Sequence, residues 1–315
     1  MLIQLFSIVA GVGILYYGGE ILVRYSTALA ISLNVKPLVI GLTVIAFGTS
    51  APELAAGVLA AVQRHPELAV GNVIGSNIAN IGLILGLTVV ITPLVAAREF
   101  VRREVLFMLA TGALLIPFVL TGRFTRWQAI VLLAAMALFL WTLLRSGSAV
   151  PEDLDEEAPE TSALLSFLGS VAGLALLIGG AQLLVWASVE MARGFGVSER
   201  VIGLTVVAFG TSVPELAGCL AAAAKKHTDL VLGNVIGSNV FNTLLVLPTT
   251  ILIRPFPVSF GGFGVDLLVM VGFSVAVVVF FARDRTLTRW EGVLLCLGYL
   301  VYIGYLAVQG SAAEA

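Results

Sequence analysis

The chain has 315 residues, of which 59% are hydrophobic and only 11% are charged, and its formal net charge is −2. A soluble domain carries about 25% charged residues, so the composition excludes an ordinary soluble protein, and no stretch is basic enough to bind nucleic acid. The apolar runs do not alternate in polarity, which excludes a membrane β-barrel. We therefore expect an all-α membrane protein.

Apolar runs of the length that a bilayer requires, about 20 residues each, follow one another along the whole chain. Charged, Pro-rich or Gly-rich stretches separate them. They predict ten transmembrane helices, at residues 2–26, 37–63, 69–92, 103–121, 126–145, 164–190, 199–223, 229–252, 262–282 and 288–308.

An acidic segment divides these helices into two sets of five. It covers residues 146–163 and holds six carboxylates between Glu152 and Glu160. So short and charged a segment cannot bury a core, and we interpret it as a solvated cytoplasmic linker. The chain then consists of a first five-helix unit (1–145), the linker and a second five-helix unit (164–315).

The two halves are repeats of each other. "VIGLTVIAFGTSAPEL" (39–54) matches "VIGLTVVAFGTSVPEL" (201–216) at fourteen of sixteen positions, and "GNVIGSNIAN" (71–80) matches "GNVIGSNVFN" (233–242) at eight of ten. The offset is 162 residues in both cases. Five crossings per repeat make the second repeat enter the membrane from the opposite side, which is the inverted-repeat plan of secondary transporters.

The distribution of Lys and Arg sets the orientation. With both termini outside, eleven of the 17 basic residues fall in cytoplasmic loops and six in outer loops. Because basic residues concentrate on the cytoplasmic side, we expect a multi-pass protein of the cytoplasmic membrane with both termini outside. Cys219 and Cys296 lie in apolar runs and are interpreted as buried hydrophobic residues, not as a disulfide or metal pair.

Each repeat carries one carboxylate deep in an apolar run, Glu53 in the second predicted helix and Glu215 in the seventh. Each costs about 2.5–3.5 kcal/mol at the bilayer centre, so the pair is expected to bind something. Pro52 has no amide hydrogen and removes a helical partner from the carbonyl of Gly48. We expect a broken helix at the midplane with free carbonyls from about Ala46 to Thr49.

Neutral oxygens accompany the carboxylates. Asn72, Ser76 and Asn80 form a stripe with four-residue spacing, and Asn234, Ser238 and Asn242 repeat it. An all-oxygen environment favours hard cations such as Ca²⁺, and two negative charges balance one Ca²⁺ or two Na⁺. Gly71 and Gly75 have the spacing of close helix packing, and we expect this segment both to pack and to build the site.

The paired motifs resemble the two α-repeats of the calcium/cation antiporter superfamily, in its prokaryotic sodium/calcium exchanger branch. The resemblance covers nearly the whole chain. It implies a secondary active antiporter, not an enzyme, which exchanges Na⁺ for Ca²⁺ by alternating access, with three Na⁺ per Ca²⁺. It implies no cofactor and no partner beyond the lipid bilayer and the two ions, so that the protein can act as a monomer.

The resemblance also implies roles for individual residues. Glu53 and Glu215, with the Thr49 and Thr211 carbonyls, would bind Ca²⁺. Ser50, Ser76 and the Ala46 carbonyl would form one Na⁺ site; Ser212, Ser238 and the Ala208 carbonyl would form the other. Asn80 and Asn242 would line the centre. The potassium-dependent branch has Asp where this chain has Asn242, so we expect transport that does not require K⁺.

Three alternatives stay open. Ca²⁺/H⁺ exchange could use the same two carboxylates, although the neutral oxygens favour Na⁺. A membrane enzyme could use the two Glu as acid and base, but such a pair needs different environments, and these two have nearly identical flanking sequences. A channel would build a ring-like filter, whereas an inverted pair suits alternating access.

Overall fold

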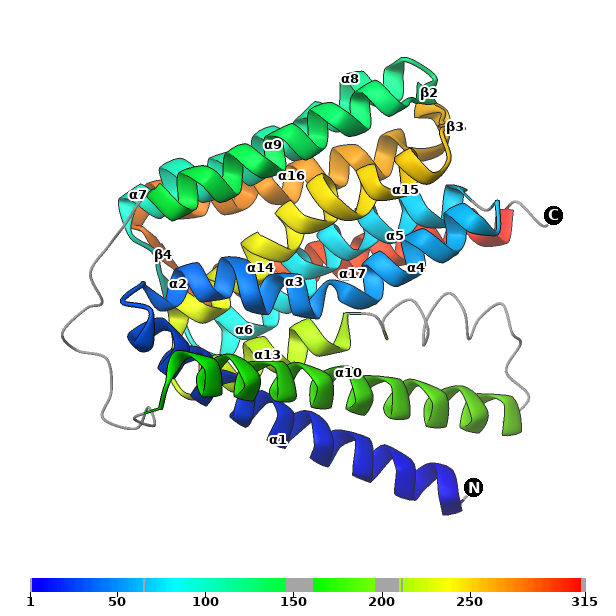
Figure 1. The fold of residues 1–315 in the computed structure, drawn as a ribbon. Coiled ribbons are helices and arrows are strands. Elements are labelled where there is room, and N and C mark those ends of the chain that lie inside the picture. Colours follow the sequence, from blue (N-terminus) through cyan, green and yellow to red (C-terminus); the bar gives the residue numbers. More distant parts are fainter. Residues whose placement is uncertain (1, 65, 146–160, 196–209, 211, 313–315) are drawn as a thin grey trace. The chain divides into compact units, whose positions relative to one another are not determined.

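The computed structural model describes residues 2–64, 66–145, 161–195, 210 and 212–312. The chain forms two compact units, which we call unit 1 (Met1–Ala55 with Leu140–Ser238) and unit 2 (Ala56–Phe139 with Asn239–Ala315). Each unit contains segments of both sequence repeats. Figure 1 shows the helices with their labels. Most of the predicted linker lies outside the described residues.

Long apolar helices dominate the described residues, as the composition predicts. Seven are long and apolar enough to cross a membrane, and a bent pair makes an eighth. The seven are Leu2–Ser32, Leu68–Ile91, Arg98–Leu120, Arg126–Arg145, Ala163–Met191, Thr228–Ile253 and Phe260–Asp284, and the bent pair is Pro37–Thr49 with Ala51–Val62. The expectation of a helical membrane protein is confirmed, while the count of ten and the inverted topology stay predictions.

Unit 1 is built around two long helices. α1 (Leu2–Ser32) and α10 (Ala163–Gly194) lie side by side, as the blue and green helices of Figure 1. Glycines allow the close approach: a Cβ on Gly11 would lie 3.2 Å from the Gly180 carbonyl oxygen, and one on Gly18 would lie 3.0 Å from the Leu177 nitrogen. The remaining elements are α2 (Pro37–Ile40), the π-helix η1 (Gly41–Ile45), α3 (Ala46–Thr49), the start of α4 (Ala51–Val62), the end of α9 (Arg126–Arg145), α13 (Val213–Ala224) and most of α14 (Thr228–Phe241).

Unit 2 contains the remaining long spans and two short strand pairs. Its elements are the rest of α4, α9 and α14, together with α5 (Pro66–Ala79), η2 (Asn80–Leu85), α6 (Gly86–Ile91), β1 (Leu94–Val95), α7 (Arg98–Phe100), η3 (Val101–Val105), α8 (Leu106–Leu120), β2 (Arg123–Phe124), η5 (Asn242–Val246), α15 (Leu247–Ile253), β3 (Phe256–Pro257), α16 (Phe260–Asp284), β4 (Thr286–Leu287) and α17 (Arg289–Ala312). β1 pairs with β4, and β2 pairs with β3, both antiparallel. The strand pairs tie the loops at the ends of the spans together.

The local backbone recurs at the offset of the sequence repeat. The π-helices η2 and η5 begin at Asn80 and Asn242, and β1 and β3 begin at Leu94 and Phe256, each pair 162 residues apart. Arg64 and Lys226, also equivalent in the repeat, both adopt the left-handed conformation, with φ of 66° and 60°. The sequence repeat therefore has a counterpart in local structure.

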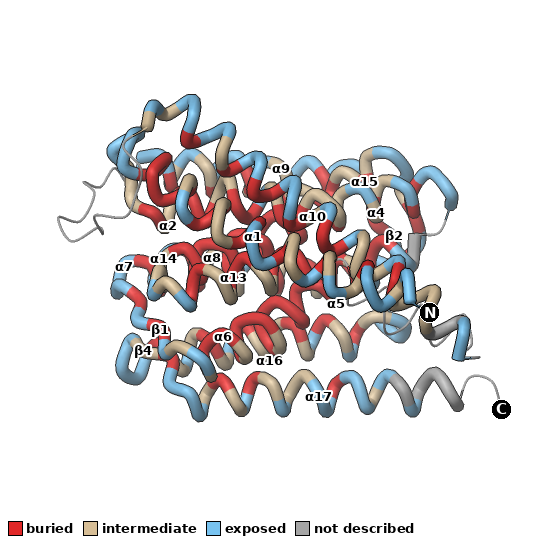
Figure 2. Tube along the Cα trace, turned by 90° about the horizontal axis from the view of Figure 1, so that it is seen from below, coloured by how far each residue is buried: buried red, intermediate tan, exposed pale blue. Residues whose placement is uncertain are grey.

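Burial differs strongly between the helices (Figure 2). In the segment Thr228–Ile253, 94% of the most apolar stretch is buried, against 33% in Phe260–Asp284. α17 exposes large apolar side chains, among them Leu300 at 60% and Val301 at 74%. In a bilayer such faces contact lipid tails, which accept apolar side chains without cost.

Candidate ion-binding site

The second predicted helix is broken where the sequence indicates. α3 ends at Thr49, α4 begins at Ala51, and the two segments are bent by 43°. Between them Ser50 leaves the helical conformation, with φ −82° and ψ 3°. Pro52 cannot donate a backbone hydrogen bond, and the break falls two residues before it and places Glu53 in the first turn of α4.

The second repeat has the same local design. Ser212 has φ −91° and ψ 2°, α13 begins at Val213, and Glu215 lies in the first turn. The positive end of a helix dipole favours a carboxylate there. Two predicted ligands of this repeat, Ala208 and Thr211, lie outside the described residues. The break before Glu215 is therefore described only from Ser212 onward.

Unit 1 brings the two carboxylates together in its interior. Glu53 and Glu215 are each only 1% exposed, and they are close enough to repel each other electrostatically. Both carboxylate oxygens of Glu215 are buried without a hydrogen-bond partner among the described residues. Two desolvated like charges are unfavourable unless a cation or a proton compensates them.

A hydrogen-bond network beside the carboxylates joins three helices of unit 1. The Thr49 hydroxyl on α3 donates to the side-chain oxygen of Asn234 on α14 at 3.1 Å. The Ser238 hydroxyl donates to the same oxygen at 3.4 Å. The Asn234 amide donates to the Glu215 carbonyl on α13 at 3.5 Å and to the Cys219 sulfur at 3.3 Å. Asn234 therefore fixes the positions of α3, α13 and α14 around Glu215.

The other predicted ligands of unit 1 are also buried. Ser50 and Ser212 are 3% and 2% exposed, and Ala46 is fully buried. The Ala46 carbonyl accepts the Ser50 amide at 3.1 Å and the Thr49 hydroxyl at 3.5 Å. The Ser50 hydroxyl has no hydrogen-bond partner within the described part of the chain.

Unit 2 holds the predicted ligands Ser76, Asn80 and Asn242, all at most 7% exposed. Asn80 begins η2 and Asn242 begins η5. π-helical turns occur frequently at functional sites because they redirect backbone and side chains. Both polar atoms of the Asn242 amide are buried without a partner among the described residues, as is the Asn80 side-chain oxygen.

Two further asparagines were not among the predicted ligands, although they are buried in unit 2. The Asn239 oxygen accepts from the Asn80 amide at 3.3 Å, and the Asn77 amide donates to the Thr243 hydroxyl at 2.9 Å. Asn77 and Asn239 fall outside the four-residue stripe. Their recurrence at the repeat offset was the signal that could have identified them.

The donor set consists of carboxylates, hydroxyls, amide oxygens and carbonyls. Among the described residues no group of three or more His, Cys, Asp or Glu side chains could hold a metal ion. Oxygen donors with few charges suit hard cations that bind and leave, in contrast to a tightly held transition metal.

Comparison with known proteins decides the family. The model of the sodium/calcium exchanger protein family matches residues 3–145 and 165–308. The chain belongs to the sodium/calcium exchanger family. The two matched segments coincide with the two predicted repeats, so the division of the sequence at the acidic linker is also the division of the family match.

The relatives of this chain align with it over nearly its whole length. The putative antiporter CaxA of Alkalimonas amylolytica is 36% identical over 97% of this chain and 98% of its own length. The sodium/calcium exchanger MaX1 of Methanosarcina acetivorans is 29% identical, over 93% and 95%. A structure of the sodium-calcium exchanger NCX_Mj soaked with Na⁺ superposes with a TM-score of 0.84 at 34% identity, over 96% of this chain and 99% of that one. These relatives are transporters and not enzymes, and they support the prokaryotic branch that the motifs indicate.

Proposed function

We propose that this chain is a secondary antiporter that exchanges Na⁺ for Ca²⁺ across the membrane. The observation that carries the proposal is the pair Glu53 and Glu215, both buried in unit 1 and close enough to interact. Two negative charges in a dry interior need cations, and they balance one Ca²⁺ or two Na⁺. Competition of both ions for the same carboxylates couples their movements in opposite directions.

The ion ligands are proposed residue by residue from the family motifs. Glu53 and Glu215 with the carbonyls of Thr49 and Thr211 would bind Ca²⁺. Ser50, Ser76 and the Ala46 carbonyl would form one flanking Na⁺ site, and Ser212, Ser238 and the Ala208 carbonyl the other flanking site, with Asn80 and Asn242 at the centre. The network of Thr49, Asn234 and Ser238 supports the part of this set that belongs to unit 1. The roles of Ser76, Asn80 and Asn242, in unit 2, stay predictions.

The exchange ratio is proposed as three Na⁺ per Ca²⁺, without K⁺. Three Na⁺ carry one more positive charge than one Ca²⁺, so each cycle would move one charge across the membrane. Asn242 is neutral where the potassium-dependent branch has Asp, and an additional K⁺ would therefore lack a counter-charge in a dry site.

Alternating access is proposed to come from movement of α1 and α10. Their glycine-lined contact, with Gly11 against Gly180 and Gly18 against Leu177, keeps the two helices together. The contact with α13 is made by small residues as well: a Cβ on Gly19 would lie 2.7 Å from the Ala221 Cβ. Such a surface has few side chains that interlock and allows the helix pair to slide. A disulfide between α1 and α13 that left transport intact would contradict this part.

Ca²⁺/H⁺ exchange is the second candidate, because buried carboxylates can also take up protons. The hydroxyl of Thr49 beside Glu215 favours Na⁺, since a proton needs only the carboxylate whereas Na⁺ needs several oxygens.

Uptake of ⁴⁵Ca²⁺ into proteoliposomes tests the proposal. Vesicles loaded with Na⁺ and diluted into choline buffer should accumulate Ca²⁺, with or without K⁺, and an inside-positive potential should accelerate uptake. Uptake indifferent to potential would exclude the ratio of three to one. Uptake that needs a pH gradient and ignores Na⁺ would replace the proposal with Ca²⁺/H⁺ exchange.

A further inference from the structure

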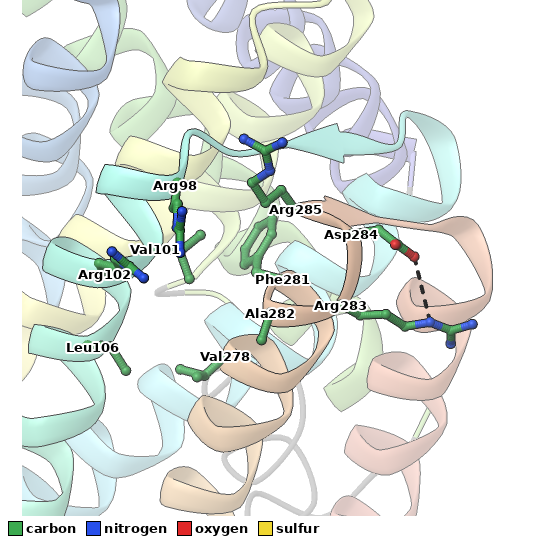
Figure 3. A pocket seen from close by; sticks show the side chains of 10 residues that line it. All are labelled: Arg98, Val101, Arg102, Leu106, Val278, Phe281, Ala282, Arg283, Asp284 and Arg285. Carbon is green, nitrogen blue, oxygen red and sulfur yellow. Dashed lines mark ion pairs between the residues drawn. The ribbon is translucent and has the colours of Figure 1, made fainter.

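A basic cavity lies at one end of unit 2. Its volume is about 640 Å³, and it is lined by the start of the span Arg98–Leu120 and by the end of α16 with the following turn (Figure 3). Four of the ten lining residues are arginines: Arg98, Arg102, Arg283 and Arg285. Neither the family resemblance nor the proposed ion sites involve these side chains.

The backbone brings arginines from distant parts of the sequence together. Arg98 and Arg102 are four residues apart on α7 and η3 and therefore share a helix face. Arg285 is the C-cap that follows α16 and adopts the left-handed conformation, with φ 57°, and its carbonyl accepts the Ala96 amide at 2.8 Å. The adjacent pairing of Val95 with Thr286 holds the turn beside the start of α7.

Positive charge in the cavity is not balanced by the residues that the structure describes. Asp284 is the one acidic lining residue, and it lies 3.6 Å from the Arg283 guanidinium. Figure 3 shows that pair directed to one side, while Arg98, Arg102 and Arg285 lie on the other. All three are exposed, and no ion pair joins them to a carboxylate among the described residues. Three like charges without counter-charges favour an anionic ligand.

The opposite wall of the cavity is apolar. It is formed by Val101 and Leu106 on one span and by Val278, Phe281 and Ala282 on α16. This wall continues away from the arginines: Val275 lies on the same face of α16 as Val278 and Ala282 and is 42% exposed, as is Leu106. A free anion would leave this surface unused, whereas an acyl chain would cover it.

We propose that this cavity binds an anionic phospholipid, with the phosphate at Arg98, Arg102 and Arg285 and an acyl chain along the apolar wall. Arginine guanidinium groups match phosphate oxygens with paired hydrogen bonds. Basic pockets between transmembrane helices on the cytoplasmic side bind anionic headgroups, and the basic loops 92–98 and 283–289 lie on the predicted cytoplasmic side. The bound phosphate relieves the repulsion among the three arginines.

Native mass spectrometry of the full chain in detergent tests this site. The probes are dioleoyl-phosphatidylglycerol, which is anionic, and dioleoyl-phosphatidylcholine, which is zwitterionic. The wild-type chain is expected to bind the first at least tenfold more tightly. R98Q/R102Q/R285Q is expected to lose at least tenfold of that affinity. The matched control R123Q/R126Q/R254Q removes three arginines near other loops of unit 2 and is expected to keep it.

Each alternative outcome overturns the proposal. Equal binding of the two lipids would mean that the anionic headgroup does not contribute to binding. Equal loss in both triple variants would mean that general charge attraction, and not this cavity, explains the binding. Displacement of the lipid by a hundredfold excess of sn-glycerol 3-phosphate would mean that the cavity binds free anions. If the first triple variant fails to fold, Ala282→Trp fills the cavity and retains every arginine. It is expected to give the same tenfold loss, and unchanged binding in that variant would refute the site.

Discussion

Replacing Gly237 with Ala tests how unit 1 positions the backbone before Glu53. Gly237 lies on α14 between Asn234 and Ser238, which belong to the hydrogen-bond network beside Glu215. A Cβ added at Gly237 would lie 2.6 Å from the Ala46 Cβ and 3.0 Å from the Leu42 Cα. Carbon atoms in contact are normally about 3.5–4.0 Å apart, so the segment from Leu42 to Ala46 must move by roughly 1 Å. No proposed ligand side chain is altered by this substitution.

The expected magnitudes follow from that displacement. Overpacking of this kind costs about 1–3 kcal/mol, and Ala in place of Gly inside a helix returns about 0.5–1 kcal/mol, so the free energy of unfolding falls by roughly 1 kcal/mol and by at most about 2.5 kcal/mol. The functional effect is larger, because ion–oxygen distances of about 2.3–2.6 Å leave little tolerance for a shift of 1 Å. We expect the Na⁺ concentration for half-maximal exchange to rise at least tenfold.

The assay is Na⁺-dependent ⁴⁵Ca²⁺ uptake into proteoliposomes, combined with thermal unfolding in detergent. The matched control is Gly272→Ala on α16, where an added Cβ meets nothing within 4 Å, and it should behave as the wild type or be slightly more stable. Wild-type Na⁺ dependence and stability in Gly237→Ala would refute the reasoning, because the α14 surface would then not determine where Ala46 lies.

Two further substitutions address unit 2. Tyr302→Phe removes the 2.8 Å hydrogen bond to Asp266 and should lower the free energy of unfolding by about 1–3 kcal/mol. The expected result is a lower Tm with unchanged Ca²⁺ affinity. A wild-type Tm would show that this bond does not stabilise the contact of α16 with α17. Asn239→Ala removes the acceptor of the Asn80 amide. The Ca²⁺ concentration for half-maximal exchange should rise about fivefold, equivalent to about 1 kcal/mol. An unchanged concentration would argue against a role of Asn80 in ion binding.

The sequence predicted the site at residues that are energetically unfavourable in their surroundings. Glu53 and Glu215 stand out because a carboxylate in an apolar run is unfavourable and the same exception occurs twice. The break at Ser50 was predictable because Pro52 lacks an amide hydrogen, and the structure has its 43° bend there. These features depend on local chemistry, which the sequence displays directly.

Other features depend on contacts between distant segments. The π-helix that begins at Asn80 has an apolar sequence that fits an α-helix equally well; it passes close to α17, where a Cβ on Gly82 would lie 2.9 Å from the Tyr299 Cβ. Asn239 was missed because the four-residue spacing skips it. The juxtaposition of Arg98 with Arg285 depends on a strand pair of two residues, which is too short to produce a sequence period.

The measurement that tests the central claim most directly is ⁴⁵Ca²⁺ uptake by Glu53→Gln and Glu215→Gln in Na⁺-loaded proteoliposomes. Gln keeps the shape of the side chain and removes its charge. We predict uptake in the wild type that requires the outward Na⁺ gradient, and loss of uptake in each variant while both remain folded by size-exclusion chromatography and thermal unfolding. Uptake at the wild-type rate in either variant would contradict the account, because one of the two buried carboxylates would then not carry the ions.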